Sequence, residues 1–284
     1  MDRRHIFILA AAAIALWPAC AYAKEDRIPH PQPALDPSSS GPVQDSSAEK
    51  VLIGAIRWDA WRLGEPHGEV LDDALLKNRI PYFAMRLPNG KLVFPGNLDH
   101  VLNADVHYAK AAGIDYFIFG YYLDTGSWRR DKAKAQELNR ALQAYLNLPS
   151  RAGVKFALSM NWSFPQEDVD AVSEALIDAV AHPDYVQAAG GKVPVFFFTP
   201  SIPNWIKGLG DDEGAARALA GIKQRVRTAA GREIYAVALM FNLREDGPRA
   251  INAGFDALST YAIGPGPIKG RAVPYASCMR FADE

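Results

Sequence analysis

Short hydrophobic runs alternate with longer amphipathic stretches from about residue 51 onward. The runs have the length of strands and are apolar at successive positions, which is typical of parallel strands covered on both faces. The predicted strands begin near residues 51, 115, 155, 193, 234 and 255.

The stretches between the runs repeat apolar residues every three to four positions, as amphipathic helices do. Three such stripes are Val101/Leu102/Ala109/Ala112, Leu138/Leu142/Tyr145/Leu146 and Val169/Val172/Leu176/Val180, and Leu219, Ile222 and Val226 form a fourth. Small-residue pairs that end in glycine stand between stretch and run at Ala112-Gly113, Ala152-Gly153, Gly190-Gly191, Ala230-Gly231 and Ala253-Gly254. Because glycine readily takes the left-handed conformation that ends a helix, each pair predicts a helix-to-strand turn.

Helix, glycine and buried strand in repetition define a β/α unit with parallel, right-handed connections. Consecutive strand spacings of about 40 residues favour an α/β fold of the (β/α)8 TIM-barrel type. An open doubly wound sheet is the alternative, although no Gly-x-Gly-x-x-Gly turn follows any strand. Six strands are clear and Val273–Met279 is a possible seventh, so we expect a barrel domain over residues 50–284 that is incomplete at its C-terminus.

The first 23 residues have the pattern of a signal peptide, with Arg3 and Arg4 before the apolar segment Ile6–Leu16 and a small-x-small site at Ala21–Ala23. The apolar segment is shorter than the roughly 20 residues that cross a bilayer. A retained anchor is the alternative. Residues 24–49 are rich in Pro and Ser and predict a flexible linker. We therefore expect a periplasmic or secreted protein without integral membrane association after signal cleavage.

Composition narrows the class of protein. The chain is 49% hydrophobic and 22% charged, as a globular domain is, and its net charge of −1 gives no basic surplus for binding nucleic acid. Two cysteines exclude a disulfide framework. The histidines show no metal-ligand spacing, and no phosphate-binding loop or Gly-x-Ser-x-Gly elbow is present. The sequence therefore predicts neither a metal nor an organic cofactor, and it leaves the oligomeric state open.

Tryptophans gather where strands are predicted to end. Apart from Trp17 in the signal peptide, they are Trp58, Trp61, Trp128, Trp162 and Trp205. The carboxyl ends of barrel strands meet at one face, where the active sites of such barrels lie. Indole rings can pack on the C–H faces of sugars and donate a hydrogen bond, so we expect an aromatic-lined carbohydrate cleft. Packing over the barrel end is the other interpretation of each ring.

Two carboxylates stand at the same predicted end. Asp59 follows the run that ends at Trp58, and Asp124 follows Tyr122-Leu123 on the neighbouring strand. Hydrolysis of a glycosidic bond uses such a pair as acid and base or nucleophile, so these are the catalytic candidates. Glu245 and Asp246 are second-choice partners.

Other acidic residues fit structural roles. Glu167 and Asp168, like Asp211, Asp212 and Glu213, stand at predicted helix starts, where negative charge complements the helix dipole. Asp115 and Asp256 open strands on the opposite, stabilising end.

Polar side chains at the predicted strand ends suit recognition of sugar hydroxyls. They are Arg57, Tyr122, Asn161, Thr199, Asn242 and Tyr261. We expect Arg57 to face the same cavity, where it either pairs with Asp124 or holds a substrate oxygen; an ion pair that only fixes the barrel end is the other interpretation.

Several segments resemble one family of barrel proteins. Ile53–Trp61, Tyr108–Phe117, His182–Tyr185 with Gly191–Val195, and Gly254–Tyr261 are similar, in this order, to the strand signatures of bacterial glycoside hydrolase family 99-like proteins, which are related to family 71 and the WbsX-type proteins. The resemblance covers about residues 51–265. It implies a (β/α)8 barrel that acts on carbohydrate without a required metal or organic cofactor, and no catalytic residue is carried over from it.

The sequence as a whole predicts an exported glycoside hydrolase-like enzyme that acts on a polysaccharide or oligosaccharide. The alternatives are a non-catalytic glycan-binding barrel and a truncated inactive homologue.

Overall fold

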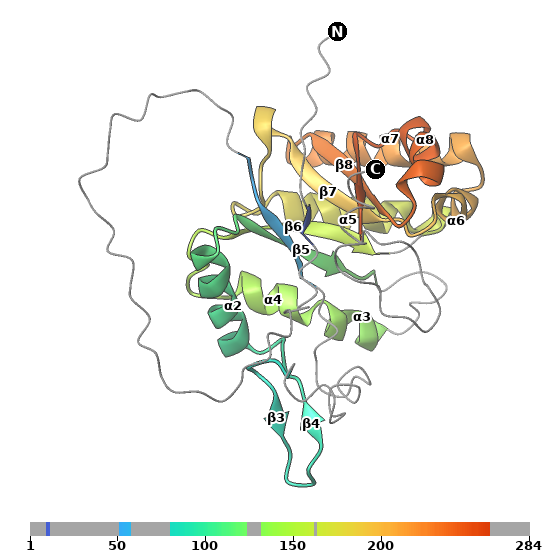
Figure 1. Cartoon of the computed structure of the whole chain (residues 1–284). Coiled ribbons are helices and arrows are strands. Elements are labelled where there is room, and N and C mark those ends of the chain that lie inside the picture. Colours follow the sequence, from blue (N-terminus) through green and yellow to red (C-terminus); the bar gives the residue numbers. More distant parts are fainter. Residues whose placement is uncertain (1–9, 12–50, 58–79, 124–131, 162–163, 262–284) are drawn as a thin grey trace, which may run out of the picture.

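A parallel sheet organises the chain. The computed structural model describes residues 10–11, 51–57, 80–123, 132–161 and 164–261. In the larger sheet the strands run in the order β1-β2-β5-β6-β7-β8-β9, and every neighbouring pair is parallel (Figure 1). The bounds are β1 Ala10–Ala11, β2 Gly54–Arg57, β5 Tyr116–Tyr121, β6 Lys155–Asn161, β7 Val193–Phe198, β8 Ile234–Met240 and β9 Ala257–Thr260.

The strand order follows the order of the chain without reversal. A doubly wound sheet reverses its order at a switch point, whereas a barrel adds each strand beside the preceding one. The described strands therefore form a curled parallel sheet that is an incomplete (β/α)8 barrel, and the prediction of the fold class is confirmed.

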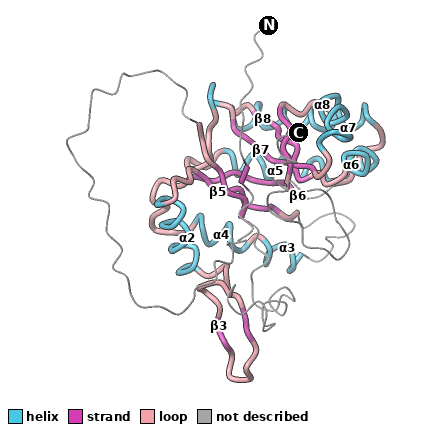
Figure 2. Tube along the Cα trace, in the orientation of Figure 1, coloured by secondary structure: helices cyan, strands magenta, loops and turns pink. Residues whose placement is uncertain are grey.

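Helices connect the strands and cover one face of the sheet (Figure 2). Their bounds are α2 Asp99–Ala111, α3 Lys132–Leu138, α4 Arg140–Leu146, α5 Val169–Val180, α6 Ile202–Gly208, α7 Asp212–Ala230 and α8 Leu243–Asn252, with short 3₁₀ turns at Gln166–Asp168 and Ala189–Gly191. Tyr145 of α4 packs against Phe117 and Phe119 of β5, with ring centroids 6.4 and 5.0 Å apart. We call this helix-covered side the outer face.

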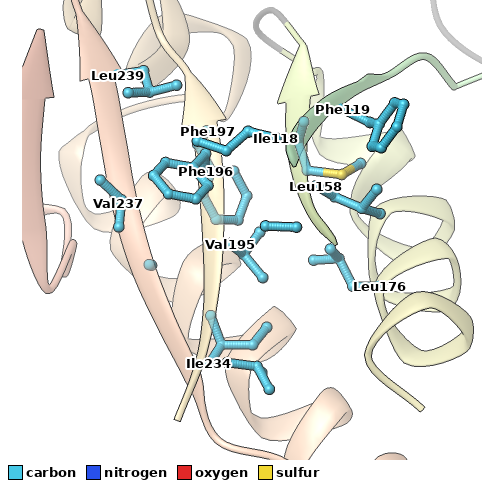
Figure 3. Close-up of a cluster of buried hydrophobic side chains, with 14 of the residues drawn as sticks. Ile118, Phe119, Leu158, Leu176, Val195, Phe196, Phe197, Ile234, Val237 and Leu239 are labelled. Atoms are coloured by element: carbon cyan, nitrogen blue, oxygen red, sulfur yellow. The ribbon is translucent and has the colours of Figure 1, made fainter. Parts of the chain in front are cut away.

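The core lies on both faces of the sheet: Leu158 and Val195 face the helices, and Ile118 and Val237, which are one position out of step with them, face the other side. Figure 3 shows Ile118, Leu158, Val195 and Val237 on strands, with Leu176 on the neighbouring helix, and all five side chains are buried. Burying a large aliphatic side chain contributes about 1.5–3 kcal/mol, so the apolar runs account for the stability of the sheet.

The strand and helix predictions hold in most of the described ranges. Strands begin within three residues of their predicted starts, and the helical stripes lie on α2, α4, α5 and α7, except that Ala112 follows α2 and Leu138 is the last residue of α3. Gly231, for example, ends α7 with a φ of 62°, the left-handed conformation that its pair with Ala230 predicted. Most of the predicted signal peptide, the linker, and the possible strand Val273–Met279 lie outside the described residues.

The chain between the second and third predicted strands holds two short helices, α3 and α4. The break falls at Asn139. Its side-chain oxygen accepts a hydrogen bond from the backbone N–H of Tyr122 at 2.9 Å, and its amide nitrogen donates one to the Tyr122 carbonyl at 2.7 Å. The side chain thus pairs with the backbone beyond the end of β5, which is a tertiary contact.

A small hairpin, β3 Met85–Arg86 and β4 Leu92–Val93, was not predicted. It projects from the body beside α2 (Figure 1). The turn carries Pro88-Asn89-Gly90, and Gly90 has a φ of 84°. Asn-Gly between two short strands is a hairpin signal, so this hairpin could have been predicted from the sequence.

Two aspartates tie the amino ends of strands to their neighbours, as the sequence predicted. Asp115 Oδ2 accepts a hydrogen bond from the Ile53 N–H at 2.9 Å, and Asp256 Oδ2 accepts one from the Ala236 N–H at 2.7 Å. Asp256 also forms an ion pair of 2.7 Å with Lys223 of α7. Both carboxylates therefore stabilise the end of the sheet opposite to the predicted site.

Candidate functional site

The inner face of the sheet is opposite to the helix-covered outer face. Successive residues of a strand point to opposite faces, so position along a strand decides which side chains lie inside. Register pairs Ser159 with Phe196, and Phe198 stands two residues further along the same strand, so these residues alternate with the outer residues Leu158 and Phe197. The carboxyl end of the inner face, which we call the mouth, is where the site is expected.

Three aromatic residues gather at the mouth. Phe198 ends β7, Phe241 directly follows β8, and Tyr261 directly follows β9. The centroid of the Tyr261 ring lies 4.6 Å from that of Phe198 and 5.9 Å from that of Phe241, and the two phenylalanines are 5.8 Å apart. We call these three residues the mouth cluster.

The mouth cluster is partly open to solvent. Phe241 is 53% exposed, and Phe198 and Tyr261 are half-buried. A phenol is already protonated at neutral pH, and burial raises the pKa of Tyr261 further, so its hydroxyl can donate. The cluster combines apolar ring surfaces with a hydroxyl donor, which is the chemistry that a sugar ring requires.

The sequence predicted only one member of the mouth cluster, Tyr261. Phe198 and Phe241 were interpreted as parts of hydrophobic runs. Their signal was position, because each is the last aromatic residue of a run and comes directly before a polar residue, Thr199 and Asn242. Asn161 ends β6 beside Phe198 in register, and its backbone therefore reaches the mouth.

Arg57 lies on the outer face, and the structure does not bring it to the predicted cavity. It pairs in register with Phe119, one of the rings packed against α4. Its guanidinium forms an ion pair with Asp105 of α2, and Nη2 donates to the Gly96 carbonyl at 2.7 Å. The alternation of faces along β2 explains this placement, and Arg57 ties the strand to α2.

Trp205 and Thr199 are fully buried, so neither offers a surface to a ligand in this structure. Trp205 of α6 packs against Phe164 and Phe255, with centroids 6.0 and 5.2 Å apart. The Thr199 hydroxyl donates to the Leu239 carbonyl at 3.4 Å. The structure gives both residues packing roles in the outer layer and at the strand end.

Asn242 and Tyr122 are held by local backbone contacts. Asn242 is exposed and caps α8, its Oδ1 accepting a hydrogen bond from the Glu245 N–H at 3.2 Å. Tyr122 is buried, and Asn139 holds its backbone on both sides. Asn242 stands directly after Phe241, so the cap fixes the chain at the edge of the mouth cluster.

Acidic residues after the strands mostly serve helix ends. Asp246 Oδ2 accepts a hydrogen bond from the Ile202 N–H at the start of α6, at 3.4 Å, and Asp211 caps α7. Asp168, at the start of α5, is buried, and its Oδ2 has no hydrogen-bond partner within the described ranges; neither has Trp205 Nε1. These polar atoms lie in the outer layer with the helices.

Six predicted site residues lie outside the described part of the chain. They are Trp58, Asp59, Trp61, Asp124, Trp128 and Trp162. The catalytic pair and four of the binding tryptophans therefore stay predictions.

A surface groove of about 510 Å³ lies between α5 and α7, away from the mouth. Asp170 and Arg225 line it and form an ion pair of 2.6 Å.

Where the structure describes the chain, no three His, Cys, Asp or Glu side chains come together in a way that could hold a metal ion. None of the helices in the described ranges has the length and apolar character needed to cross a bilayer.

Comparison with known proteins finds similarity among solved structures. No protein-family model matches the chain, and no curated protein matches it. The GH99 endo-α-mannosidase of Bacteroides thetaiotaomicron is similar over 63% of this chain with 13% identity and a TM-score of 0.44. A second structure of a GH99 endo-α-mannosidase from Bacteroides thetaiotaomicron, in complex with BIS-TRIS-propane, is similar over 69% of this chain with 13% identity and a TM-score of 0.45. The similar region spans about half the length of these proteins, 48% and 56%.

Proposed function

We propose that this chain is an exported carbohydrate-active protein that binds a polysaccharide at the mouth and hydrolyses it in the manner of a glycoside hydrolase. The mouth cluster carries this proposal. Phe198, Phe241 and Tyr261 come from three successive strands and meet at the barrel end where such folds bind their substrates.

The chemistry of the cluster suits a sugar better than a charged or purely apolar ligand. Aromatic faces pack on the C–H faces of a pyranose, and the protonated Tyr261 hydroxyl can donate to a sugar oxygen. The carboxylates that follow β8 serve helix ends: Asp246 accepts a hydrogen bond from the Ile202 N–H, and Glu245 lies in the first turn of α8. The described part of the mouth therefore binds mainly through ring surfaces and hydroxyls.

Catalysis is assigned to the carboxylates that the sequence places after β2 and β5. Asp59 and Asp124 are the proposed acid and base or nucleophile, and Trp58, Trp61, Trp128 and Trp162 are proposed to extend the binding surface. Two strands that are neighbours in register, β2 and β5, lead into them. Glycosidic hydrolysis needs its two carboxyl groups on the two sides of the scissile bond.

A glycan-binding protein without catalysis is the second candidate. It is favoured by the structure of the described mouth, whose members are aromatic and whose nearby Asp246 already serves a helix end. The two candidates share the cluster and differ only in Asp59 and Asp124.

Binding and turnover separate these functions. Soluble α-mannan and α-glucan are offered to the full chain, with affinity measured by gel electrophoresis in polysaccharide and turnover by the release of reducing ends. We expect Phe241→Ala to weaken binding roughly three- to tenfold, because an aromatic contact contributes about 0.5–1.5 kcal/mol. Ile251→Ala, a substitution at an equally exposed apolar position on α8, is the matched control and should bind normally.

Substitution of the carboxylates tests the chemistry. Asp59→Asn and Asp124→Asn should abolish turnover and leave polysaccharide affinity intact. Unchanged turnover removes the catalytic role of the substituted residue, and binding without any turnover in the unsubstituted chain selects the second candidate. If Phe241→Ala and Ile251→Ala bind equally well, the mouth cluster is not the binding site.

Export has its own test. The mature protein recovered from the periplasm or medium of a bacterial host should begin at Lys24, as cleavage after Ala23 requires. A mature chain that still begins at Met1 would remove the proposed signal peptide.

A further inference from the structure

We propose that Tyr82 and Tyr108 form a second glycan-binding surface on the outer side of the barrel, separate from the mouth cluster. The inference rests on the proposed function in one respect, since both surfaces would bind the same polysaccharide. We call Tyr82 and Tyr108 the outer tyrosine pair.

The outer tyrosine pair is unusually exposed for aromatic residues. Tyr82 is 58% exposed and Tyr108 is 64% exposed, and Met85 beside them in the hairpin is 51% exposed. The two tyrosine rings lie 5.8 Å apart at 79°, so their open faces meet at a corner. Phe83 supports Tyr82 from another side with an edge contact of 5.3 Å. Exposed aromatic faces of this kind can pack on the C–H faces of a sugar ring.

The position of the Tyr82 ring is fixed before any ligand binds. Its hydroxyl lies 2.9 Å from Asp105 Oδ1 and 3.1 Å from the Val101 carbonyl, so its single proton is shared between these two acceptors on α2. Burial of the phenol, together with the negative charge of Asp105, raises the Tyr82 pKa well above its usual range. Because the hydroxyl end is anchored, the ring presents its faces and loses little freedom on binding.

The same contacts make the surface suitable for a neutral ligand. Asp105 is the nearest carboxylate to the Tyr82 hydroxyl, and its charge is balanced by the ion pair with Arg57. A charged peptide therefore finds no uncompensated partner in this pair.

The size of the surface also favours a sugar. A stable protein interface buries about 800 Å² on each partner, which is far more than two tyrosines and a methionine offer. The face of one tyrosine ring can instead pack on one sugar unit. Tyr108 is in α2 and Tyr82 lies three residues before β3, whereas the mouth cluster comes from the end of β7 and from the residues directly after β8 and β9. In Figure 1, α2 and β3 lie on the other side of the molecule from β7 and β8. A long polysaccharide can engage both surfaces at once, and a short oligosaccharide can engage only one.

Chain length of the ligand is therefore the variable that tests the proposal. The probes are soluble α-mannan and its tetrasaccharide, each offered to the full chain. We expect Tyr108→Ala to weaken binding of the polymer roughly three- to tenfold and to leave tetrasaccharide binding at the mouth unchanged. Phe241→Ala should weaken both. Tyr82→Ala should behave like Tyr108→Ala, and Ile251→Ala should match the unsubstituted chain with both probes.

The outcomes separate this proposal from the proposed function. Equal polymer binding by Tyr108→Ala and Ile251→Ala overturns the outer surface while the mouth remains supported through Phe241→Ala. A chain that binds neither probe overturns both. Tyr108→Ala sits on a helix surface where alanine is favourable, so thermal unfolding should show an intact fold. If sedimentation shows a dimer that Tyr108→Ala dissociates, the surface is a contact between copies and the glycan proposal falls.

Discussion

The rings of Phe198 and Tyr261 contact each other at 4.6 Å between centroids, although β8 lies between the strands that carry them. Neighbouring strands are about 4.8 Å apart, so β7 and β9 are separated by about twice that distance. Side chains two strands apart converge on the concave face of a curled sheet. The curl of the barrel therefore brings the mouth cluster together.

On the inner face, we expect the exposed Phe241 to contribute mainly to binding and the buried Phe196 to contribute mainly to stability. Phe241 is half-exposed, so Phe241→Ala should lower the free energy of unfolding by less than about 1 kcal/mol. Phe196, on the same face but fully buried, should cost about 3–5 kcal/mol when it is replaced by alanine. Urea unfolding of the two variants measures the difference. Equal losses would show that Phe241 acts mainly in packing.

Gly54 and Tyr116 fit together too closely for any side chain at position 54. A Cβ there would lie 2.3 Å from Tyr116 Cζ and 2.7 Å from its hydroxyl oxygen. We expect Gly54→Ala to destabilise the chain by about 1–3 kcal/mol, as overpacking does. In a Tyr116→Leu background, which lacks the clashing atoms, the same substitution should cost nothing further.

The matched control for the Gly54→Ala and Tyr116→Leu variants is Gly221→Ala in α7, where an added Cβ would have no atom within 4 Å. Alanine in a helix interior is favoured over glycine by about 0.5–1 kcal/mol, so this variant should be more stable. Additive losses for Gly54→Ala and Tyr116→Leu in denaturant unfolding would contradict the predicted coupling.

The Arg57–Asp105 ion pair should contribute more than the surface pairs. Its side chains are only 14% and 20% exposed. Arg57→Met should cost about 1.5–3 kcal/mol, the range for a hydrogen bond to a charged group that loses its partner. Arg217→Met, which breaks an exposed pair with Glu213, should cost no more than about 0.5 kcal/mol. Thermal or urea unfolding compares them, and similar losses for both variants would contradict this.

High pH should destabilise the fold through its buried phenols. Burial raises the pKa of Tyr116 to about 12 and also raises the pKa values of Tyr145 and Tyr185. An unfolded chain releases these protons near pH 10, whereas the folded chain keeps them. Their contribution to stability is therefore complete below about pH 10 and is lost as pH rises toward the folded values, at up to about 1.4 kcal/mol per pH unit for each group.

Urea unfolding between about pH 8 and pH 11 measures this slope. Tyr145→Phe should be less stable at neutral pH, because its hydroxyl donates to the Val154 carbonyl at 2.6 Å, but its stability should fall less steeply above about pH 10. Ile251→Ala, a substitution at an exposed position that changes no titrating group, should keep the slope of the unsubstituted chain. Identical slopes for all three proteins would contradict the assignment to buried phenols.

The sequence revealed the strands and their order because buried parallel strands require continuous apolar runs, and glycine pairs mark the turns into them. It did not reveal the break at Asn139, because that break depends on the backbone of Tyr122, a residue in another element. The hydrophobic pattern predicts that a helix is present. The tertiary hydrogen bonds of Asn139 determine that this helix is divided into α3 and α4.

The site was predicted less completely for a geometric reason. Arg57 and Trp205 both follow the rule that functional residues stand near strand ends, yet one lies on the outer face of β2 and the other in the buried side of α6. Which face a side chain occupies depends on a single residue of register. Phe198 and Phe241 were missed for the converse reason, because a ring inside a hydrophobic run resembles core until the register is known.

The sequential strand order also shapes how this protein would assemble during synthesis. Tyr116 of β5 pairs with Lys155, and Val193 of β7 pairs with Ile234, so β6, β7 and β8 each join a neighbour about 40 residues behind them, and β9 joins β8 across a shorter stretch. Each of these strands can therefore pair with its neighbour soon after it leaves the ribosome. The longest closure joins β2 to β5, where Gly54 meets Tyr116 across the segment that holds the hairpin. Because this closure spans more residues than any other between the described strands, we expect it to be the slowest pairing of the sheet.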